Sequence, residues 1–150
     1  MKFKSRVVHG VDRPTRIHKE SEGAHVPPIY QTSTFLFDDV AHGARAFSSP
    51  DHAGAHIYTR ISNPNNNALE QSITALECYD LDSDGYTSMV FGTGMAAIST
   101  AIMVMAKQGQ VLAQDALYGC SSQLLFEQAP QWGIDADFID FTDLHTFQEK

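Results

Sequence analysis

Apolar and polar positions alternate regularly in the second half of the chain. Short apolar runs predict strands over 88–91, 111–113 and 136–141, and stretches with apolar residues at helical spacing predict helices over 95–106 and 121–131. The first of these helices is apolar nearly all round, which favours an interior position. The order strand, helix, strand, helix, strand indicates an α/β domain whose mostly parallel sheet carries helices on both faces.

One further helix signal precedes this alternation. Asn67 and Glu70 are spaced as in a capping box, and the apolar residues after them lie on one helical face, which predicts a helix from Asn67 to about Cys78. At the other end of the chain, residues 142–150 predict the start of another helix. No capping signal ends it, which is typical of a truncated domain.

Residues 1–62 differ from the rest of the chain. They are polar, rich in His and turn-forming residues, and show little periodicity outside the run 29–37. Loops of this length are uncommon inside a compact domain unless they are functional or pack against another surface. We therefore predict an extended N-terminal arm over 1–62 that contacts a neighbouring subunit, followed by an incomplete α/β domain over 63–150.

Composition and charge exclude several classes of function. The 10 Lys and Arg residues against 18 Asp and Glu residues give a net charge of −8, which disfavours binding to nucleic acid. Cys78 and Cys120 lack the spacing of a redox pair and suit a reducing compartment. No apolar stretch is long enough to cross a bilayer or to form a secretory signal. We expect a cytoplasmic protein that binds neither nucleic acid nor membrane.

The strongest sign of chemistry is the turn Gly92-Thr93-Gly94, which joins a predicted strand to a predicted helix. Glycines let the backbone approach an anion closely, and the start of a helix offers unpaired N–H groups, so the turn is typical of a phosphate site. Its G-x-G-x-x-A pattern, followed by Asp115 near the next strand, also fits a nicotinamide dinucleotide. A third interpretation is that the glycines serve only close packing of strand and helix.

Three other residues and one histidine pair are further candidates for ligand binding. Tyr58 and Arg60 occupy alternate positions of a segment predicted to be extended, so both point to one side and suit a phosphate; alternatively they are a half-buried Tyr and a solvated Arg. Tyr118 follows the second predicted strand, where an aromatic ring can stack on a planar cofactor. His52 and His56 lack a nearby third ligand, so we predict exposed loop histidines and no metal site.

Four motifs resemble, in the same order, those of the pyridoxal-phosphate-dependent enzymes of cysteine and methionine metabolism, the trans-sulfuration family. They are GAHVPPIYQTSTF at 23–35, IYTRISNP at 57–64, GTGMAA at 92–97 and LYGC at 117–120. Within the family they are most similar to those of the methionine γ-lyases, then of the O-acetylhomoserine sulfhydrylases. The resemblance implies a fold-type-I transferase domain, pyridoxal 5′-phosphate as cofactor and a small amino-acid substrate. It also implies a homodimer that shares its active sites and assembles further into a tetramer.

The resemblance also implies a role for each candidate. The backbone N–H groups of Gly94 and Met95 bind the cofactor phosphate, and Tyr58 and Arg60 reach the same phosphate in the neighbouring subunit. Tyr118 stacks on the pyridine ring and acts as acid and base, with nearby cations favouring its ionised form.

The resemblance further implies that Cys120 lies next to the substrate. The alternative from the residue type alone is a small buried side chain that only fills space.

The chain departs from the family pattern in two respects. Asn65 stands where the family usually has Thr. In the family, the lysine that binds the cofactor covalently and the acid that pairs with the pyridine nitrogen both lie beyond the part that this chain matches. None of the five lysines of the chain matches the family's lysine: Lys2, Lys4, Lys19, Lys107 and Lys150. We therefore expect half an active site that does not turn over substrate by itself.

The function implied for the complete enzyme is γ-elimination of methionine or related γ-substituted amino acids. The alternative is γ-replacement, as in O-acetylhomoserine sulfhydrylase or cystathionine γ-synthase. Two hypotheses of other classes stay open at this point: a nicotinamide-dependent oxidoreductase, and a non-catalytic fragment that keeps the arm and the phosphate turn.

Overall fold

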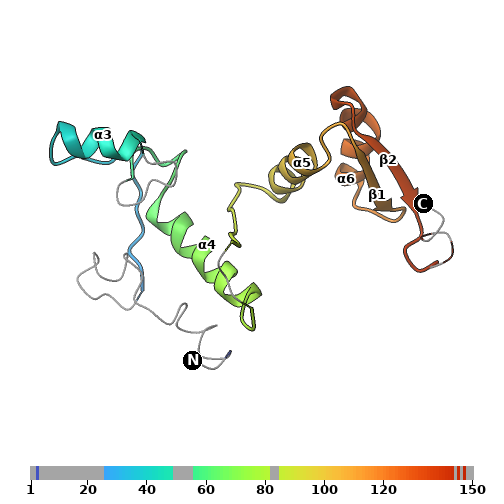
Figure 1. Ribbon diagram of the computed structural model, residues 1–150, viewed down its shortest axis with the longest axis horizontal. Coiled ribbons are helices and arrows are strands. Elements are labelled where there is room, and N and C mark those ends of the chain that lie inside the picture. Colours follow the sequence, from blue (N-terminus) through green and yellow to red (C-terminus); the bar gives the residue numbers. More distant parts are fainter. Residues whose placement is uncertain are drawn as a thin grey trace. The chain divides into compact units, whose positions relative to one another are not determined.

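The computed structural model describes residue 3, residues 26–48, 56–81 and 85–143, and residues 145 and 147. The chain divides into two compact units, Met1–Val90 and Phe91–Lys150, which are drawn in Figure 1. The N-terminal part of the predicted arm, the acidic part of the predicted loop after Leu81, and Leu144 in the predicted C-terminal helix lie outside the described residues.

The first unit contains the helix α4, Pro64–Glu77. It begins earlier than the capping-box pattern predicts, because Asn63 is its N-cap and Pro64 its first residue, the position where proline is best tolerated. Glu70 is not part of a cap: its carboxylate accepts the backbone N–H of Val90 at 2.9 Å. The predicted capping box at Asn67 is therefore wrong, while the predicted end of the helix near Cys78 agrees with the structure.

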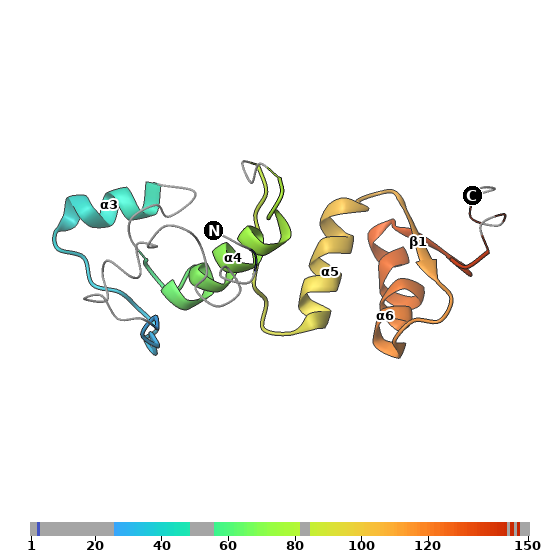
Figure 2. The same cartoon turned by 90° about the horizontal axis from the view of Figure 1, so that it is seen from below.

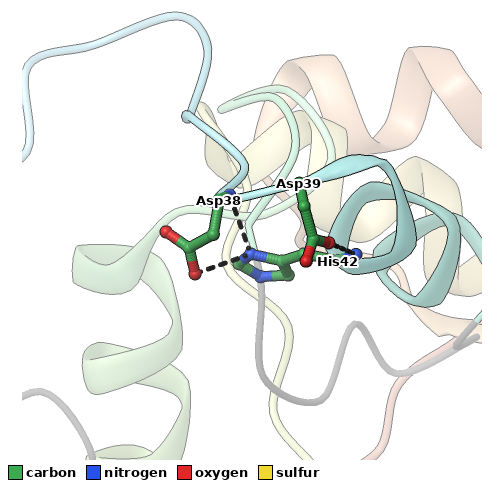
Figure 3. A network of polar contacts seen from close by, with 3 residues as sticks. All are labelled: Asp38, Asp39 and His42. Atoms are coloured by element: carbon green, nitrogen blue, oxygen red, sulfur yellow. Dashed lines mark hydrogen bonds and ion pairs between the residues drawn. The ribbon is translucent and has the colours of Figure 1, made fainter.

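A second helix of this unit, α3 (Val40–Ser48), was not predicted from periodicity. Its start is held by polar contacts shown in Figure 3: the Asp39 carboxylate accepts the backbone N–H of His42 at 2.6 Å. The Nδ1 atom of His42 lies 3.2 Å from the backbone nitrogen of Asp38 and 3.2 Å from its carboxylate. These are contacts within one helix start, and they account for a helix in a stretch that the sequence alone presents as an arm.

The second unit contains a parallel pair of strands joined by a helical connection (Figures 1 and 2). The strands β1 and β2 pair in register from Gln110↔Asp135 to Gln114↔Ile139. The elements, in chain order, are α5 (Gly94–Met105), β1 (Gln110–Gln114), α6 (Gly119–Gln123), the π-helical turn η1 (Leu124–Gln128), the 3₁₀ turn η2 (Ala129–Trp132) and β2 (Asp135–Ile139). The predicted helix over 121–131 corresponds to α6, η1 and η2 in succession.

The core of this unit lies between the helical connection and the strands. Four buried residues form it: Ala113, Leu125, Ala129 and Ile134. The rings of Phe126 and Phe138 stack beside it, with centroids 4.4 Å apart. The helical stretch ends at Gly133, whose φ of 73° is a left-handed conformation that glycine adopts without strain.

Two expectations about the strand and helix around the glycine turn are wrong. Residues 88–91 do not form a strand in the described chain, because a strand requires a neighbouring strand and the N–H of Val90 bonds to a side chain instead. The helix α5 is not interior: it has no buried residue, and Val104 and Met105 are 72% and 86% exposed. Its Ile102 packs on the core, and its start lies beside α6 (Figure 2).

No helix of the described residues is both long and apolar enough to cross a membrane.

Candidate functional site

The N-terminus of α5 presents unpaired backbone donors. Thr93 caps the helix: its hydroxyl accepts the N–H of Ala96 at 3.1 Å, and its carbonyl accepts the N–H of Ala97 at 3.2 Å. In the part of the chain that the structure describes, no acceptor takes the N–H groups of Gly94 and Met95. These two donors, together with the positive end of the helix dipole, form a site suited to an anion.

The Cβ positions of the two glycines in the turn face open space. A Cβ atom added to Gly92 or Gly94 would have no described atom within 4 Å, so close packing among the described residues does not account for either glycine. Neither glycine has a left-handed φ, so the backbone conformation does not require them. The space beside both glycines is open, which leaves room for a ligand to approach the backbone closely at the start of α5.

The Thr93 cap makes a testable contribution. Replacing Thr93 with alanine removes the acceptor for the Ala96 N–H and is expected to lower the free energy of unfolding by about 1 kcal/mol. Urea denaturation of the complete gene product measures this change. Thr100→Ala, within the same helix but away from its start, is the matched control. An equal effect of both substitutions would contradict the capping role.

Tyr58 and Arg60 lie together, but not in the predicted extended geometry. The backbone turns after Tyr58, because its carbonyl accepts the N–H groups of Ile61 and Ser62 at 2.8 and 3.0 Å. The Arg60 guanidinium carbon lies 5.0 Å from the centroid of the Tyr58 ring, within the range of a cation–π interaction. Arg60 is exposed, whereas Tyr58 is half-buried.

The turn after Tyr58 is held by contacts with distant residues that the sequence analysis did not predict. Tyr58 forms an antiparallel bridge with Thr34, and the buried Asn63 and the neighbouring Asn65 bond to the backbone at Pro28 and Tyr30. The signal that was available is Asn-Pro, which is typical of an N-cap followed by the first helical residue.

His56 differs from its prediction as an exposed loop residue. It is half-buried, its ring centroid lies 5.2 Å from that of Phe35, and its Nδ1 atom lies 3.0 Å from the Ser62 hydroxyl. His52, its predicted neighbour, lies outside the described residues. Among the residues that the structure describes, no three His, Cys, Asp or Glu side chains gather in a way that could hold a metal ion.

Tyr118 and Cys120 occupy the start of α6. The Tyr118 side chain is 73% exposed, so its ring face is available to a ligand. A hydrogen bond to the Cys120 side chain, the electrostatic interaction with that side chain and partial desolvation raise the pKa of the Tyr118 phenol above its usual value. At neutral pH the phenol is therefore protonated. Cys120 is exposed, so the interpretation as a buried filler is wrong.

A contact between two helix starts brings four of the predicted residues into one unit. The hydroxyl of the buried Ser121 lies 3.8 Å from the sulfur of Met95, which places the start of α6 beside the start of α5. Gly94, Met95, Tyr118 and Cys120 thus lie at adjoining helix N-termini, whereas Tyr58 and Arg60 form a separate pair in the other unit.

The carboxyl ends of the two strands carry a polar network. The Gln114 side chain donates to the Asp115 carboxylate at 2.7 Å and accepts the N–H of Phe141 at 2.6 Å. Hydrogen bonds from the hydroxyl and N–H of Thr142 lower the pKa of Asp140. These groups bond to one another and hold the loops that follow β1 and β2.

The comparison with known families decides the assignment. A family model described as "Cys/Met metabolism PLP-dependent enzyme" matches residues 7–150. The chain belongs to this family. The family's cofactor is pyridoxal phosphate, which agrees with the open N-terminus of α5 as a phosphate site. The assignment to this family replaces the nicotinamide interpretation of the glycine turn and Asp115.

Curated relatives of this pyridoxal-phosphate-dependent chain are named for two related activities. The L-methionine gamma-lyase of Pseudomonas putida is 34% identical over 147 residues, which are 97% of this chain and 34% of the relative. That of Fusobacterium nucleatum subsp. polymorphum is 38% identical, over 87% of this chain and 32% of the relative. The O-acetyl-L-homoserine sulfhydrylase of Leptospira meyeri is 32% identical, over 81% and 26%. The chain spans about a third of the length of the first two relatives.

A solved structure confirms the predicted fold class of this family member. A crystal structure from Campylobacter jejuni, named as an O-acetylhomoserine (thiol)-lyase with a pyridoxyl-lysine phosphate, matches 99% of this chain with a TM-score of 0.76 and 24% identity. The match covers 34% of that chain. The parallel pairing of β1 and β2, with helical segments between them, is the part of the predicted α/β architecture that the described residues contain.

Proposed function

We propose that this chain supplies the phosphate-binding part of a pyridoxal-phosphate site, and that the complete enzyme catalyses γ-elimination of methionine or a related γ-substituted amino acid. The observation that carries the proposal is the N-terminus of α5. There the N–H groups of Gly94 and Met95 have no acceptor among the described residues, and Gly92 and Gly94 are exposed. The 34% and 38% identity to methionine gamma-lyases supports the choice of substrate class.

The phosphate is held from two directions in this proposal. The N–H groups of Gly94 and Met95 bind it at the helix start, where the dipole favours a negative charge. The Arg60 guanidinium, with Tyr58 beside it, binds the same phosphate in a neighbouring subunit through charge-assisted hydrogen bonds. This role gives the arm over 1–62 its function and requires at least a dimer, which we propose assembles further into a tetramer.

Tyr118 provides a ring face and a proton in the same site. When bound, pyridoxal phosphate withdraws electrons from the substrate carbons next to the amino group, which allows the γ-substituent to leave. The exposed ring of Tyr118 stacks on the planar cofactor, and its phenol is protonated at neutral pH, as a donor to the leaving sulfur requires. A cation from the neighbouring subunit, Arg60, favours the ionised form once that proton has gone.

Cys120 adjoins Tyr118 on the first turn of α6 and is exposed. In this proposal it lies beside the bound substrate without forming a bond to it. Its side chain raises the pKa of the Tyr118 phenol, which favours the protonated form of that phenol.

The second candidate function is γ-replacement on an O-acetylated homoserine with a thiol or sulfide. The sulfhydrylase of Leptospira meyeri, at 32% identity, favours it. The two reactions share their early steps and use the same phosphate and phenol, so the described residues serve either one.

Product analysis separates these candidates. The complete gene product, supplied with methionine, is expected to release methanethiol, 2-oxobutanoate and ammonia in equal amounts. Incubation with O-acetylhomoserine and sulfide serves as the comparison. If homocysteine from the second mixture is the only product, γ-replacement is the function and not elimination. Absence of turnover in both mixtures would contradict the proposed activity.

A further inference from the structure

We propose that the side-chain amides of Asn63 and Asn65 are positioning groups that hold the turn carrying Tyr58 and Arg60 in the geometry for the cofactor phosphate. The inference rests on the proposed function of Arg60 and deepens it. It concerns residues that touch neither substrate nor cofactor and act through the backbone of the arm.

Asn63 uses both ends of its amide. It is only 4% exposed, and its oxygen accepts the N–H of Asn65 at 2.9 Å, which caps α4. Its nitrogen donates to the Tyr30 carbonyl and to the Thr59 hydroxyl, each at 3.1 Å. Capping needs only the oxygen. The nitrogen is therefore left to connect the helix start with the backbone at Tyr30 and with Thr59, the residue between Tyr58 and Arg60.

Asn65 makes a second connection to the same segment, at Pro28 and Tyr30. Its oxygen accepts the N–H of Tyr30 at 2.8 Å, and its nitrogen donates to the Pro28 carbonyl at 2.7 Å. An amide can pair with a backbone N–H and a backbone carbonyl at once because its acceptor and donors sit on different atoms, whereas a hydroxyl has one oxygen for both tasks. Asn65 therefore ties the start of α4 to residues 28–30 through both ends of its amide.

Thr59 links the contacts of Asn63 to Tyr58 and Arg60, the two residues proposed to bind the phosphate. Its N–H donates to the Ser33 carbonyl at 2.9 Å, and its hydroxyl donates to the Thr32 carbonyl while accepting from Asn63. Thr59 is thus bonded through both backbone and side chain, and Tyr58 and Arg60 flank it on either side. Loss of the amide donors leaves the turn free to shift, and a bidentate contact from Arg60 tolerates little displacement.

The test replaces each amide nitrogen by an oxygen. Asn63→Asp and Asn65→Asp keep the accepting oxygen, and with it the cap of α4, but remove the donors to Tyr30, Thr59 and Pro28. In the complete gene product each variant is expected to bind pyridoxal phosphate about tenfold more weakly. Binding of pyridoxal, which lacks the phosphate, is expected to change by less than about twofold, since no charge-assisted contact is lost.

Asn66 provides the matched control. It is exposed, it lies in the same run of asparagines, and no side-chain hydrogen bond is found for it in the described part of the chain. Asn66→Asp adds the same charge without removing a donor and is expected to leave both affinities unchanged. An equal loss in Asn66→Asp would attribute the effect to charge and overturn the inference.

An uncharged variant keeps the inference testable where the Asp variants do not fold. Thr59→Val keeps the side-chain shape, removes the shared hydroxyl and is expected to weaken pyridoxal phosphate selectively over pyridoxal. Equal weakening of both ligands, or no weakening, overturns the positioning role. If Arg60→Ala weakens pyridoxal phosphate selectively while these variants do not, only the inference fails. If wild type does not prefer pyridoxal phosphate over pyridoxal, the proposed function itself fails.

Discussion

Replacing Tyr118 with phenylalanine is expected to slow γ-elimination by about 10² to 10⁴-fold while the affinity for pyridoxal phosphate changes little. A positioned general acid contributes about this factor, and the phenylalanine ring keeps the stacking face but lacks the proton. The structure provides both properties at one residue: an exposed ring at the start of α6, and a phenol whose pKa is raised by Cys120. Steady-state release of 2-oxobutanoate and titration with the cofactor measure the two quantities.

Tyr86→Phe is the matched control for this substitution. Tyr86 is also exposed, at 62%, and lies outside the helix starts that form the site. It is expected to leave turnover unchanged. Unchanged turnover in Tyr118→Phe as well would remove the acid role, and a parallel loss of cofactor affinity would reduce Tyr118 to a binding residue.

Replacing Arg60 with alanine is expected to weaken pyridoxal phosphate by about 10 to 100-fold, because a charge-assisted hydrogen bond contributes about 1.5–3 kcal/mol. The phosphate-free pyridoxal is expected to bind almost as before. Fluorescence titration of the complete gene product with each ligand measures the difference. Increasing salt is expected to reduce the advantage of wild type over the variant, since screening weakens an exposed ionic contact.

Arg45→Ala is the control for loss of positive charge. Arg45 is exposed on α3, in the same unit as Arg60 but away from its turn. Similar losses in both variants would mean that overall charge, rather than a specific contact, governs cofactor binding.

Local signals account for the parts of the fold and site that the sequence predicts well. The alternation of apolar runs locates β1, β2 and the helical stretch between them to within a few residues. The turn Gly92-Thr93-Gly94 locates the start of the next helix to within one residue, since α5 begins at Gly94; the capping role of Thr93 was not predicted. These features depend on residues close together in the chain, so their pattern is visible without the fold.

Features that depend on distant partners are not predicted. Residues 88–91 have the composition of a strand but no strand beside them among the described residues, and their Val90 bonds to Glu70. The amide contacts from Asn63 and Asn65 reach back more than 30 positions to Pro28 and Tyr30. A turn cluster of one proline and several asparagines indicates a helix start, but nothing in it specifies which carbonyl each amide will bind.

A crystal structure of the complete gene product with pyridoxal phosphate tests the central claim most directly. The account predicts phosphate oxygens about 3 Å from the backbone nitrogens of Gly94 and Met95, with the Arg60 guanidinium of a neighbouring subunit on the same phosphate. A phosphate held elsewhere, with the N-terminus of α5 facing only solvent, would contradict it.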